Sequence, residues 1–492
     1  TDCHNTHNQS VKLESCADCH EGVATEEDLE EIRMASSVID YNGNGDTEEG
    51  IYHEIEGLRE KLYEAIQAYA SEAIGPYIIY SESAYPYWFI DTNMNGQVDA
   101  GETTNANKYA QWTPRLVKAT YNFQYSLKDP GAFAHNAKYV IELLFDSIED
   151  INSVLSTPIE FDVSRNDSGH FDPTSEAWRH WDADGAVQAS CARCHSGAGL
   201  DYYAANGTNP TVSMPVSWGL TCENCHSSIG SDRSVEAPVK YLATAVFPSG
   251  TTVNNNAEAP DNSFLCLTCH VGRESKTSVD AAITAGTFGF KNVHYAPAGS
   301  MLYGADAHVG YEYTGKTYQT KFTHGTGSAS ANCAYCHTIE GEAHSFEPEL
   351  HSSCLDCHDE ASIDDIESIR KNRSGDYNGN GNTTEPLADE VEGLITALYL
   401  QMQTYCTNTL TSPIIYDANT YPYFFKDTNG NGQVDAGEAT NANKFTAWNA
   451  TVMKAAFNFQ FAKKESGAWA HNTKYVVQLL IDSIEDLGGN VS

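Results

Sequence analysis

Six pentads of the pattern Cys-x-x-Cys-His stand in the chain and use most of its 14 cysteines. Two thiolates at this spacing bond the vinyl-derived carbons of a porphyrin, and the histidine that follows binds the iron, so the pentad is the attachment signature of c-type haem. Zinc ribbons and redox dithiols also use Cys-x-x-Cys, but neither requires a histidine directly after the second cysteine. We therefore expect covalent haem at six motifs: Cys16, Cys19 and His20; Cys191, Cys194 and His195; Cys222, Cys225 and His226; Cys266, Cys269 and His270; Cys333, Cys336 and His337; and Cys354, Cys357 and His358.

The N-terminus resembles a seventh motif. The chain opens Thr1-Asp2-Cys3-His4, the last four residues of such a pentad, and an internal repeat aligns Cys3 and His4 with the end of a complete motif. We expect a seventh haem here, whose first cysteine would precede Thr1. The alternative is a mature N-terminus with one thioether or a free Cys3.

The histidine supply predicts the second axial ligand. Of 18 histidines, seven follow a motif cysteine when His4 is counted, and eleven remain, whereas the six methionines lie in no evident ligand context. Two imidazoles on each iron predict low-potential haems with no open coordination position. The sequence therefore favours electron transfer over catalysis.

The chain contains an internal duplication. Residues 40–45 return as 376–381, 91–102 as 427–438 and 135–140 as 471–476, all at one offset of 336 residues. We predict a haem and calcium repeat at 1–154, a central three-haem segment at 155–331, and a second haem and calcium repeat at 332–492. The expected fold is mostly α-helical, with extensive irregular loops wrapped around the haems.

The duplication also selects distal histidines, because a ligand should recur where its haem recurs. His135 and His471 recur, and each begins an apolar helical stripe, which after His135 includes Tyr139. We therefore expect their imidazoles to point into buried surface. A core histidine without iron is the alternative. The predicted distal ligands are His7, His135, His180, His294, His324, His344 and His471, with His170 and His308 as reserves.

Two loops fit the twelve-residue oxygen-ligand pattern of a calcium site. Oxygens at positions 1, 3, 5 and 9, a backbone carbonyl at 7, glycine at 6 and glutamate at 12 surround a hard divalent cation. The predicted ligands are Asp91, Asn93, Asn95, Gln97, Asp99 and Glu102, and in the second repeat Asp427, Asn429, Asn431, Gln433, Asp435 and Glu438.

Two further loops share the first half of this pattern and carry glutamate at position 10. We expect modified calcium sites there, with an Asn-Gly turn as the alternative. The residues are Asp40, Asn42, Asn44, Asp46 and Glu49, and Asp376, Asn378, Asn380, Asn382 and Glu385. Bound cations would help to hold an acidic chain compact.

Composition limits the partners. With 28 Lys and Arg against 67 Asp and Glu, the net charge is −39, which repels nucleic acid and anionic lipid. No apolar run of 18 residues occurs, so we expect no membrane span. Helical patterning is clearest at 51–71, 105–127 and 138–150 and at their counterparts, and we expect the unpaired Cys406 to be a small buried residue.

Several segments resemble the multihaem c-type cytochromes of metal-respiring bacteria: 169–172, 179–182, 292–295 and 467–472. The last is similar to the distal-histidine helix of the pentahaem nitrite reductase and octahaem reductase group, which implies that His135 and His471 bind iron. The chain lacks the Cys-x-x-Cys-Lys motif of those reductases. Some relatives that it resembles polymerise into extracellular filaments, so a homopolymer is one expectation for this chain.

The leading functional prediction is an electron conduit that passes electrons to other cytochromes or to extracellular acceptors such as metal oxides. The alternatives are a reductase of nitrite, hydroxylamine or a sulfur oxyanion, and an adhesion or assembly module built on the calcium repeats. Covalent haem is attached after export, so we expect an extracellular or cell-surface protein, with the periplasm as the alternative.

Overall fold

Helices and loops dominate the computed structural model, and the only strands among the described residues are short. The structure describes residues 3–5, 7–17, 20, 22–33, 39–160, 164–165, 175–227, 239–324, 332–337, 346, 348, 350, 352–355, 358, 365–370 and 375–491. This mostly α-helical character with many loops agrees with the predicted fold class.

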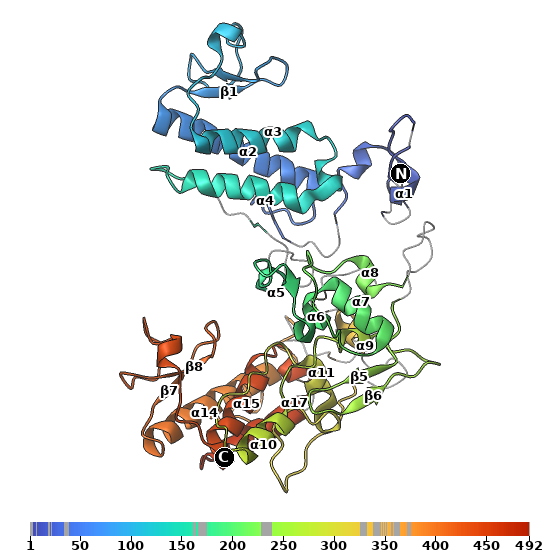
Figure 1. Cartoon of the computed structure of the whole chain (residues 1–492), viewed down its shortest axis with the longest axis vertical. Helices are drawn as coiled ribbons and strands as arrows, with labels where there is room; N and C mark the ends of the chain where they lie inside the picture. Colours follow the sequence, from blue (N-terminus) through green and yellow to red (C-terminus); the bar gives the residue numbers. More distant parts are fainter. Residues whose placement is uncertain are drawn as a thin grey trace. The chain divides into compact units, whose positions relative to one another are not determined.

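The chain divides into two compact units (Figure 1). Unit 1 comprises Thr1–His180, Trp218–Pro238 and Ala343–Ser345, and unit 2 comprises Trp181–Ser217, Val239–Glu342 and Phe346–Ser492. The three-domain division expected from the repeats stays a prediction.

Unit 1 is built on three long helices, α2, α3 and α4, that pack side by side (Figure 1). Leu58, Leu62, Leu116 and Leu144 are fully buried between them, which makes this bundle the hydrophobic core of the unit. Its elements are α1 (Leu13–Ala17), η1 (Glu27–Leu29), α2 (Ile51–Tyr69), the π-helical η2 (Ala70–Ile74), β1 (Ile78–Tyr80), β2 (Trp88–Ile90), η3 (Asn105–Asn107), α3 (Pro114–Lys128), α4 (Ala132–Asn152), α5 (Glu176–Arg179) and α8 (Cys222–Cys225).

Unit 2 combines a similar bundle, α14, α15 and α17, with the loops and short helices of the central segment. Its first elements are β3 (Ala186–Val187), α6 (Ala189–His195), α7 (Gly197–Asn206), β4 (Met214–Pro215), β5 (Thr244–Val246), β6 (Thr252–Asn254), α9 (Ser263–Cys266), α10 (Lys276–Thr284), α11 (Ala298–Tyr303) and η5 (Gly304–Asp306). Its remaining elements are α12 (Cys333–His337), α13 (Ser352–Leu355), α14 (Leu387–Asn408), β7 (Ile414–Tyr416), β8 (Phe424–Lys426), η7 (Asn441–Asn443), α15 (Ala450–Lys463), α16 (Ala468–His471) and α17 (Thr473–Asp486).

Corresponding helices of the two repeats begin with corresponding caps. The Thr113 hydroxyl accepts from the Leu116 N–H at the start of α3, and the Asn449 side chain accepts from the Val452 N–H at the start of α15. The prediction of one helix over 105–127 was wrong in its first part, because a helix with Pro114 in its first turn begins there, after an extended cap residue. Antiparallel hairpins β1–β2 and β7–β8, which the periodicity did not predict, precede these helices.

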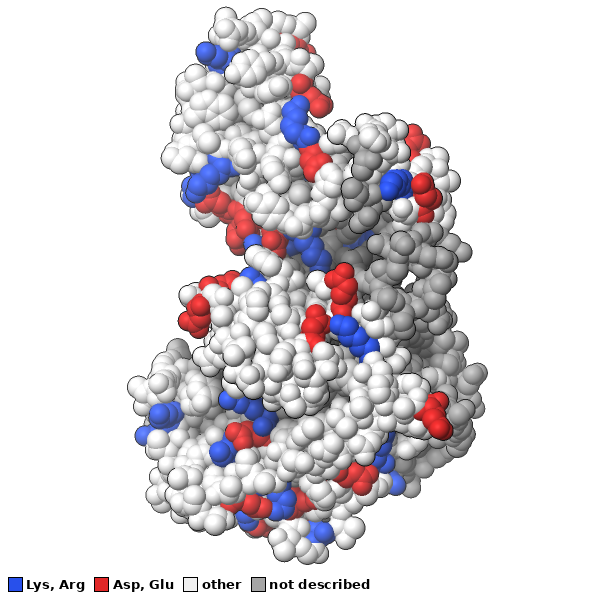
Figure 2. Space-filling model, turned by 45° about the vertical axis from the view of Figure 1, so that its right-hand side comes forward, with Lys and Arg blue, Asp and Glu red and all other residues white. Residues whose placement is uncertain are grey.

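Three further findings concern the burial of Cys406, the surface charges and the length of the apolar helices. Cys406 is fully buried, as predicted, and burial raises the pKa of its thiol to about 12. Figure 2 shows Lys and Arg side chains interspersed with Asp and Glu side chains over the described surface of one face. No described helix combines the length and the apolar character that crossing a bilayer requires.

Candidate haem and metal sites

The attachment motifs lie on or at the end of short helices, as seen at α1, α6, α8, α9, α12 and α13. In His20, His270 and His358 the backbone N–H donates to the carbonyl of the first motif cysteine over 2.8–3.0 Å. One helical turn puts residues i, i+3 and i+4 on the same side, so both sulfurs and the imidazole can face one porphyrin. Cys19, Cys357 and the predicted distal ligand His344 lie outside the described residues, as does the reserve His170.

The structure brings four motif histidines together with four of the predicted distal histidines. The ring centres are 6.2 Å apart for His4 and His135, 5.9 Å for His195 and His294, 6.0 Å for His358 and His324, and 6.1 Å for His337 and His471. An imidazole nitrogen binds a metal at about 2 Å and lies about 1.1 Å from its ring centre, so two imidazoles across one iron have ring centres about 6.2 Å apart. Each pair therefore has the spacing that an iron between the rings requires.

A carboxylate holds the distal histidine at the same place in both repeats. His135 Nδ1 lies 2.7 Å from Asp129 Oδ2, and His471 Nδ1 lies 3.2 Å from Glu465 Oε1. Burial lowers the pKa of His471, but Glu465 outweighs this effect and the pKa is raised overall. A carboxylate on Nδ1 leaves Nε2 to face a metal and increases the basicity of the ligand.

Backbone carbonyls do the same for two motif histidines. His4 Nδ1 lies 3.2 Å from the Gln9 carbonyl oxygen, and His337 Nδ1 lies 2.6 Å from the Phe346 carbonyl oxygen. Burial lowers the pKa of His337, which favours the neutral imidazole that binds metals. In these two pairs each Nδ1 therefore lies 2.6–3.2 Å from an oxygen, which for His471 is an ion-pair contact rather than a hydrogen bond.

Sequence reasoning missed these carboxylates and the glycines beside them. A Cβ built on Gly131 would lie 2.7 Å from His135 Cε1, and one built on Gly467 would lie 2.5 Å from His471 Cε1. The duplication could have predicted both features, because an acidic residue stands six positions before the histidine and a glycine four positions before it in both copies.

The expected burial of the recurring histidines is wrong in the first repeat. The side chain of His135 is 56% exposed, whereas that of His471 is 22% exposed. Tyr139, on the stripe after His135, is exposed, and its counterpart Tyr475 is fully buried. The reason is that segment 293–320 packs over the second bundle, where Asn458 hydrogen-bonds to the backbone of Tyr311 and Asn472 donates to the Thr320 carbonyl.

The remaining predicted distal histidines have surface positions. His7 is exposed in a turn. His180 Nδ1 lies 2.7 Å from Glu176 Oε1, and the reserve His308 Nδ1 lies 2.9 Å from Glu312 Oε2. Their roles as iron ligands stay predictions.

Attachment motifs of unit 2 lie directly against one another. The Cys194 sulfur is 3.7 Å from the Thr268 carbonyl oxygen, beside Cys269, and the Cys194 and Cys269 side chains share a hydrogen bond. The motif at 333–337 lies against α9, the helix that ends at Cys266, because the Cys333 N–H donates to Ser263 Oγ over 2.8 Å.

The Cys333 and Cys266 side chains are also neighbours, and Cys266 lowers the pKa of the Cys333 thiol. Burial raises the pKa of the Cys336 thiol, and the nearby Cys354 adds to this effect. The motifs at 191–195, 266–270 and 333–337 therefore adjoin in this order, and Cys354 lies near enough to Cys336 to affect its pKa.

The predicted calcium loops have the backbone of an oxygen-ligand loop. Asp91 Oδ1 accepts from the Met94 N–H and Asp91 Oδ2 from the Gly96 N–H, while Asn95 Oδ1 accepts from the Gln97 N–H. Asp91 and Glu102 are buried, and hydrogen bonds from Thr92 lower the pKa of Glu102. The loop at 427–438 repeats these hydrogen bonds. Among the described residues, no three His, Cys, Asp or Glu side chains are grouped closely enough to hold a metal by themselves.

The modified loops are closed by their position-10 glutamates. Glu49 Oε1 accepts from the side-chain amides of Asn42 and Asn44 over 2.6 and 2.9 Å, and Glu385 does the same in the second repeat. The fully buried Glu54 anchors the first loop by accepting from the Asn42 N–H and from Arg33. Burial raises the pKa of Glu54.

Repeated Cys-x-x-Cys-His turns, four of whose histidines have a second imidazole with its ring centre about 6 Å away, are typical of multihaem c-type cytochromes. The chain is 31% identical over 367 residues to the C-type polyheme cytochrome OmcB of two strains of Geobacter sulfurreducens, a match that covers 64% of this chain and 46% of OmcB. It is 29% identical over 377 residues to the C-type polyheme cytochrome OmcC of Geobacter sulfurreducens, covering 65% of this chain and 45% of OmcC.

These relatives confirm the resemblance to the multihaem c-type cytochromes of metal-respiring bacteria. The chain spans about half the length of the curated relatives that it matches. No protein-family model and no solved structure matches it.

Proposed function

We propose that this chain is an electron-transfer conduit in which closely spaced, bis-histidine haems pass single electrons along the protein. The observation that carries the proposal is the contact between successive attachment motifs in unit 2. Thioether sulfurs sit at the porphyrin edge, so neighbouring sulfurs in contact bring neighbouring haem edges together. The protein's part is to hold the haems in this order and to adjust their potentials.

The motif at 266–270 supports a linear electron relay. Its two cysteines contact different neighbours, because Cys269 meets Cys194 while Cys266 meets Cys333. The haem at 266–270 would then receive electrons from one neighbour and pass them to the other.

Paired imidazoles support transfer rather than catalysis. An iron held by His337 and His471, or by His195 and His294, has no open position for a substrate. In the pairs His4–His135 and His337–His471, the oxygens beside Nδ1 would make the rings stronger donors to ferric iron and thus favour low potentials.

The calcium loops have a structural role in this proposal. Each joins the hairpin to the helix bundle of its repeat, and the buried carboxylates of Asp91, Glu102, Asp427 and Glu438 would be neutralised by bound cations. The duplicated haem and calcium module would thereby hold the haems of both repeats in place.

We further propose that the chain is exported and acts at the cell surface or in the periplasm, with other cytochromes or extracellular acceptors such as metal oxides as partners. Haem attachment outside the cytosol supports the location, and the named polyheme relatives support the class of partner. Assembly into a homopolymer is part of this proposal.

Low-temperature EPR of the purified oxidised protein tests the conduit. We expect low-spin ferric haem throughout and a mass increase of six or seven haem groups. A stoichiometric high-spin ferric signal that changes on adding nitrite or hydroxylamine would instead indicate a reductase with an open iron.

A further inference from the structure

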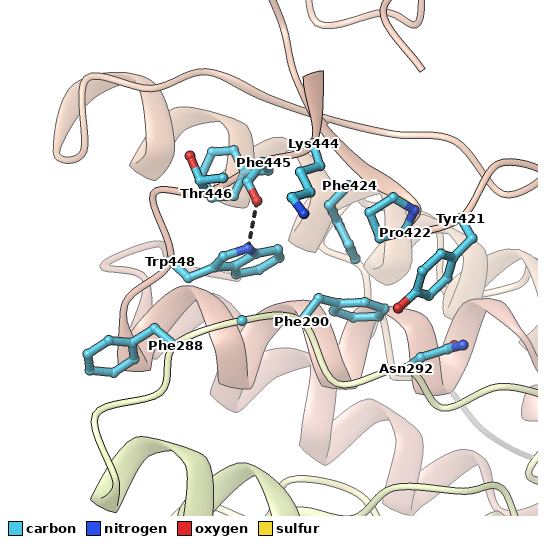
Figure 3. A pocket seen from close by; sticks show the side chains of 11 residues that line it. Phe288, Phe290, Asn292, Tyr421, Pro422, Phe424, Lys444, Phe445, Thr446 and Trp448 are labelled. Atoms are coloured by element: carbon cyan, nitrogen blue, oxygen red, sulfur yellow. Dashed lines mark hydrogen bonds between the residues drawn. The ribbon is translucent and has the colours of Figure 1, made fainter. Parts of the chain in front are cut away.

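One pocket of unit 2 has no part in the predicted haem and calcium sites. It has a volume of about 300 Å³ and lies between the loop 288–292 and the residues on either side of the predicted calcium loop 427–438 (Figure 3). None of its eleven lining residues belongs to an attachment motif or to the predicted axial and calcium ligands. The chemistry assigned to the chain above therefore does not account for this pocket.

Aromatic rings form most of the pocket walls. Phe290 stacks on Trp448, with ring centres 6.0 Å apart and planes at 24°. Phe424 lies edge-on to both rings, with its centre 4.7 Å from that of Phe290 and 5.6 Å from that of Trp448. The Trp448 indole N–H donates to the Phe445 carbonyl over 2.9 Å, as the dashed line in Figure 3 marks. Trp448 thus offers apolar ring surface to the pocket, which favours a flat aromatic ligand.

Hydrogen bonds hold both walls of the pocket in position. Directly after the loop 288–292, the Val293 N–H donates to Gln460 Oε1 of α15 over 3.0 Å. On the opposite wall, the Phe445 N–H donates to the Phe424 carbonyl over 2.9 Å. A pocket whose walls are already ordered loses little conformational entropy when a ligand binds.

The charge of the pocket is opposite to that of the chain. Lys444 is the only charged residue among those that line the pocket, whereas the whole chain has 67 Asp and Glu against 28 Lys and Arg. In Figure 3 the ammonium group of Lys444 points toward the aromatic rings of the pocket. Asn292 and Tyr421 add an amide and a hydroxyl group to the lining. A lysine at an otherwise uncharged aromatic pocket selects an anionic ligand over a cationic one.

The volume sets the size of the ligand. A protein cavity of about 150 Å³ accepts one benzene molecule. The pocket, at about 300 Å³, therefore has room for two fused rings.

We propose that this pocket binds a planar aromatic carboxylate of two fused rings. The ring system lies against Phe290 and Trp448, and the carboxylate pairs with Lys444. This site is independent of the electron conduit proposed above, because binding requires no electron transfer.

Equilibrium dialysis of 2-naphthoate against the full-length holoprotein tests the site, in about 0.15 M salt to screen the acidic surface. We expect saturable binding of one molecule per chain, which an excess of 2-naphthylmethylammonium does not displace. Phe290→Ala should weaken binding about tenfold, because it removes a stacking ring. Lys444→Gln should weaken binding about fivefold, a modest effect because this lysine is exposed.

The first repeat supplies a matched control. Lys108 has the place of Lys444 and forms a β-bridge with Phe89, as Lys444 does with Phe425. Lys108→Gln should leave the binding of 2-naphthoate unchanged.

Absence of saturable binding, or equal binding by the parent, Phe290→Ala and Lys444→Gln proteins, would overturn the site. Displacement of 2-naphthoate by 2-naphthylmethylammonium would overturn the selection of an anion. None of these outcomes changes the EPR spectrum expected of a conduit, so the failure of this site and the failure of the conduit are distinguishable.

Discussion

Glu465→Gln should raise the reduction potential of the haem at 333–337. Glu465 Oε1 lies 3.2 Å from His471 Nδ1, and its side chain is 3% exposed. An iron held by Nε2 would lie about 7 Å from this carboxylate, since a metal–imidazole bond is about 2 Å long. One charge at that distance, at an effective dielectric constant of about 20, changes the ferric-ferrous energy gap by about 2.4 kcal/mol, or about 100 mV. Removing the negative charge destabilises the ferric state, so the shift is upward.

The first repeat contains a matched control. Asp129→Asn removes the equivalent carboxylate beside His135, but there the carboxylate is 41% exposed and the imidazole 56% exposed. Water raises the effective dielectric constant toward about 80, which limits the shift to about 25 mV. Glu485→Gln, which removes a surface carboxylate paired with Lys316, should leave the potentials unchanged.

Spectroelectrochemical titration of the three variants against the parent protein measures these shifts. A downward shift in Glu465→Gln, or equal shifts for Glu465→Gln and Asp129→Asn, would refute the argument that a buried carboxylate sets the potential of this haem.

Three further changes probe the same framework. Gly467→Ala puts a Cβ 2.5 Å from His471 Cε1 and should displace that ligand, which would appear as one high-spin haem by EPR; an unchanged low-spin spectrum would contradict the pairing. Calcium chelation should lower the thermal unfolding midpoint, and calcium but not magnesium should restore it, whereas Glu438→Gln should reduce this dependence. Arg370→Met leaves the fully buried Glu390 unpaired and should cost about 3–5 kcal/mol in denaturant unfolding; a cost under about 1 kcal/mol would show that the pair is not needed.

The local features of the site could be predicted because their chemistry is encoded in short spacings. Two cysteines and a histidine at i, i+3 and i+4 fall on one side of a single helical turn wherever the chain passes, as at His20 and His358. The resemblance to polyheme cytochromes followed from the same motifs, and the relatives confirm it. The helices over 51–71 and 138–150 were also predicted, because their apolar periodicity is long.

The tertiary structure decided which segments meet. His195 and His294 are separated by 99 residues, and His337 and His471 by 134, so no spacing rule selects these partners. The adjoining order of the attachment motifs in unit 2 likewise depends on long-range packing.

The repeated sequence did not predict that equivalent residues of the two repeats differ in burial. Tyr139 and Tyr475 occupy equivalent helical positions, yet one is exposed and the other fully buried. Burial depends on what packs over a helix face, and segment 293–320 covers the second bundle. The sequence by itself determined the haem chemistry and the repeated framework. The tertiary structure alone decided the imidazole partners and the burial of the second helix face, because these depend on contacts between distant segments.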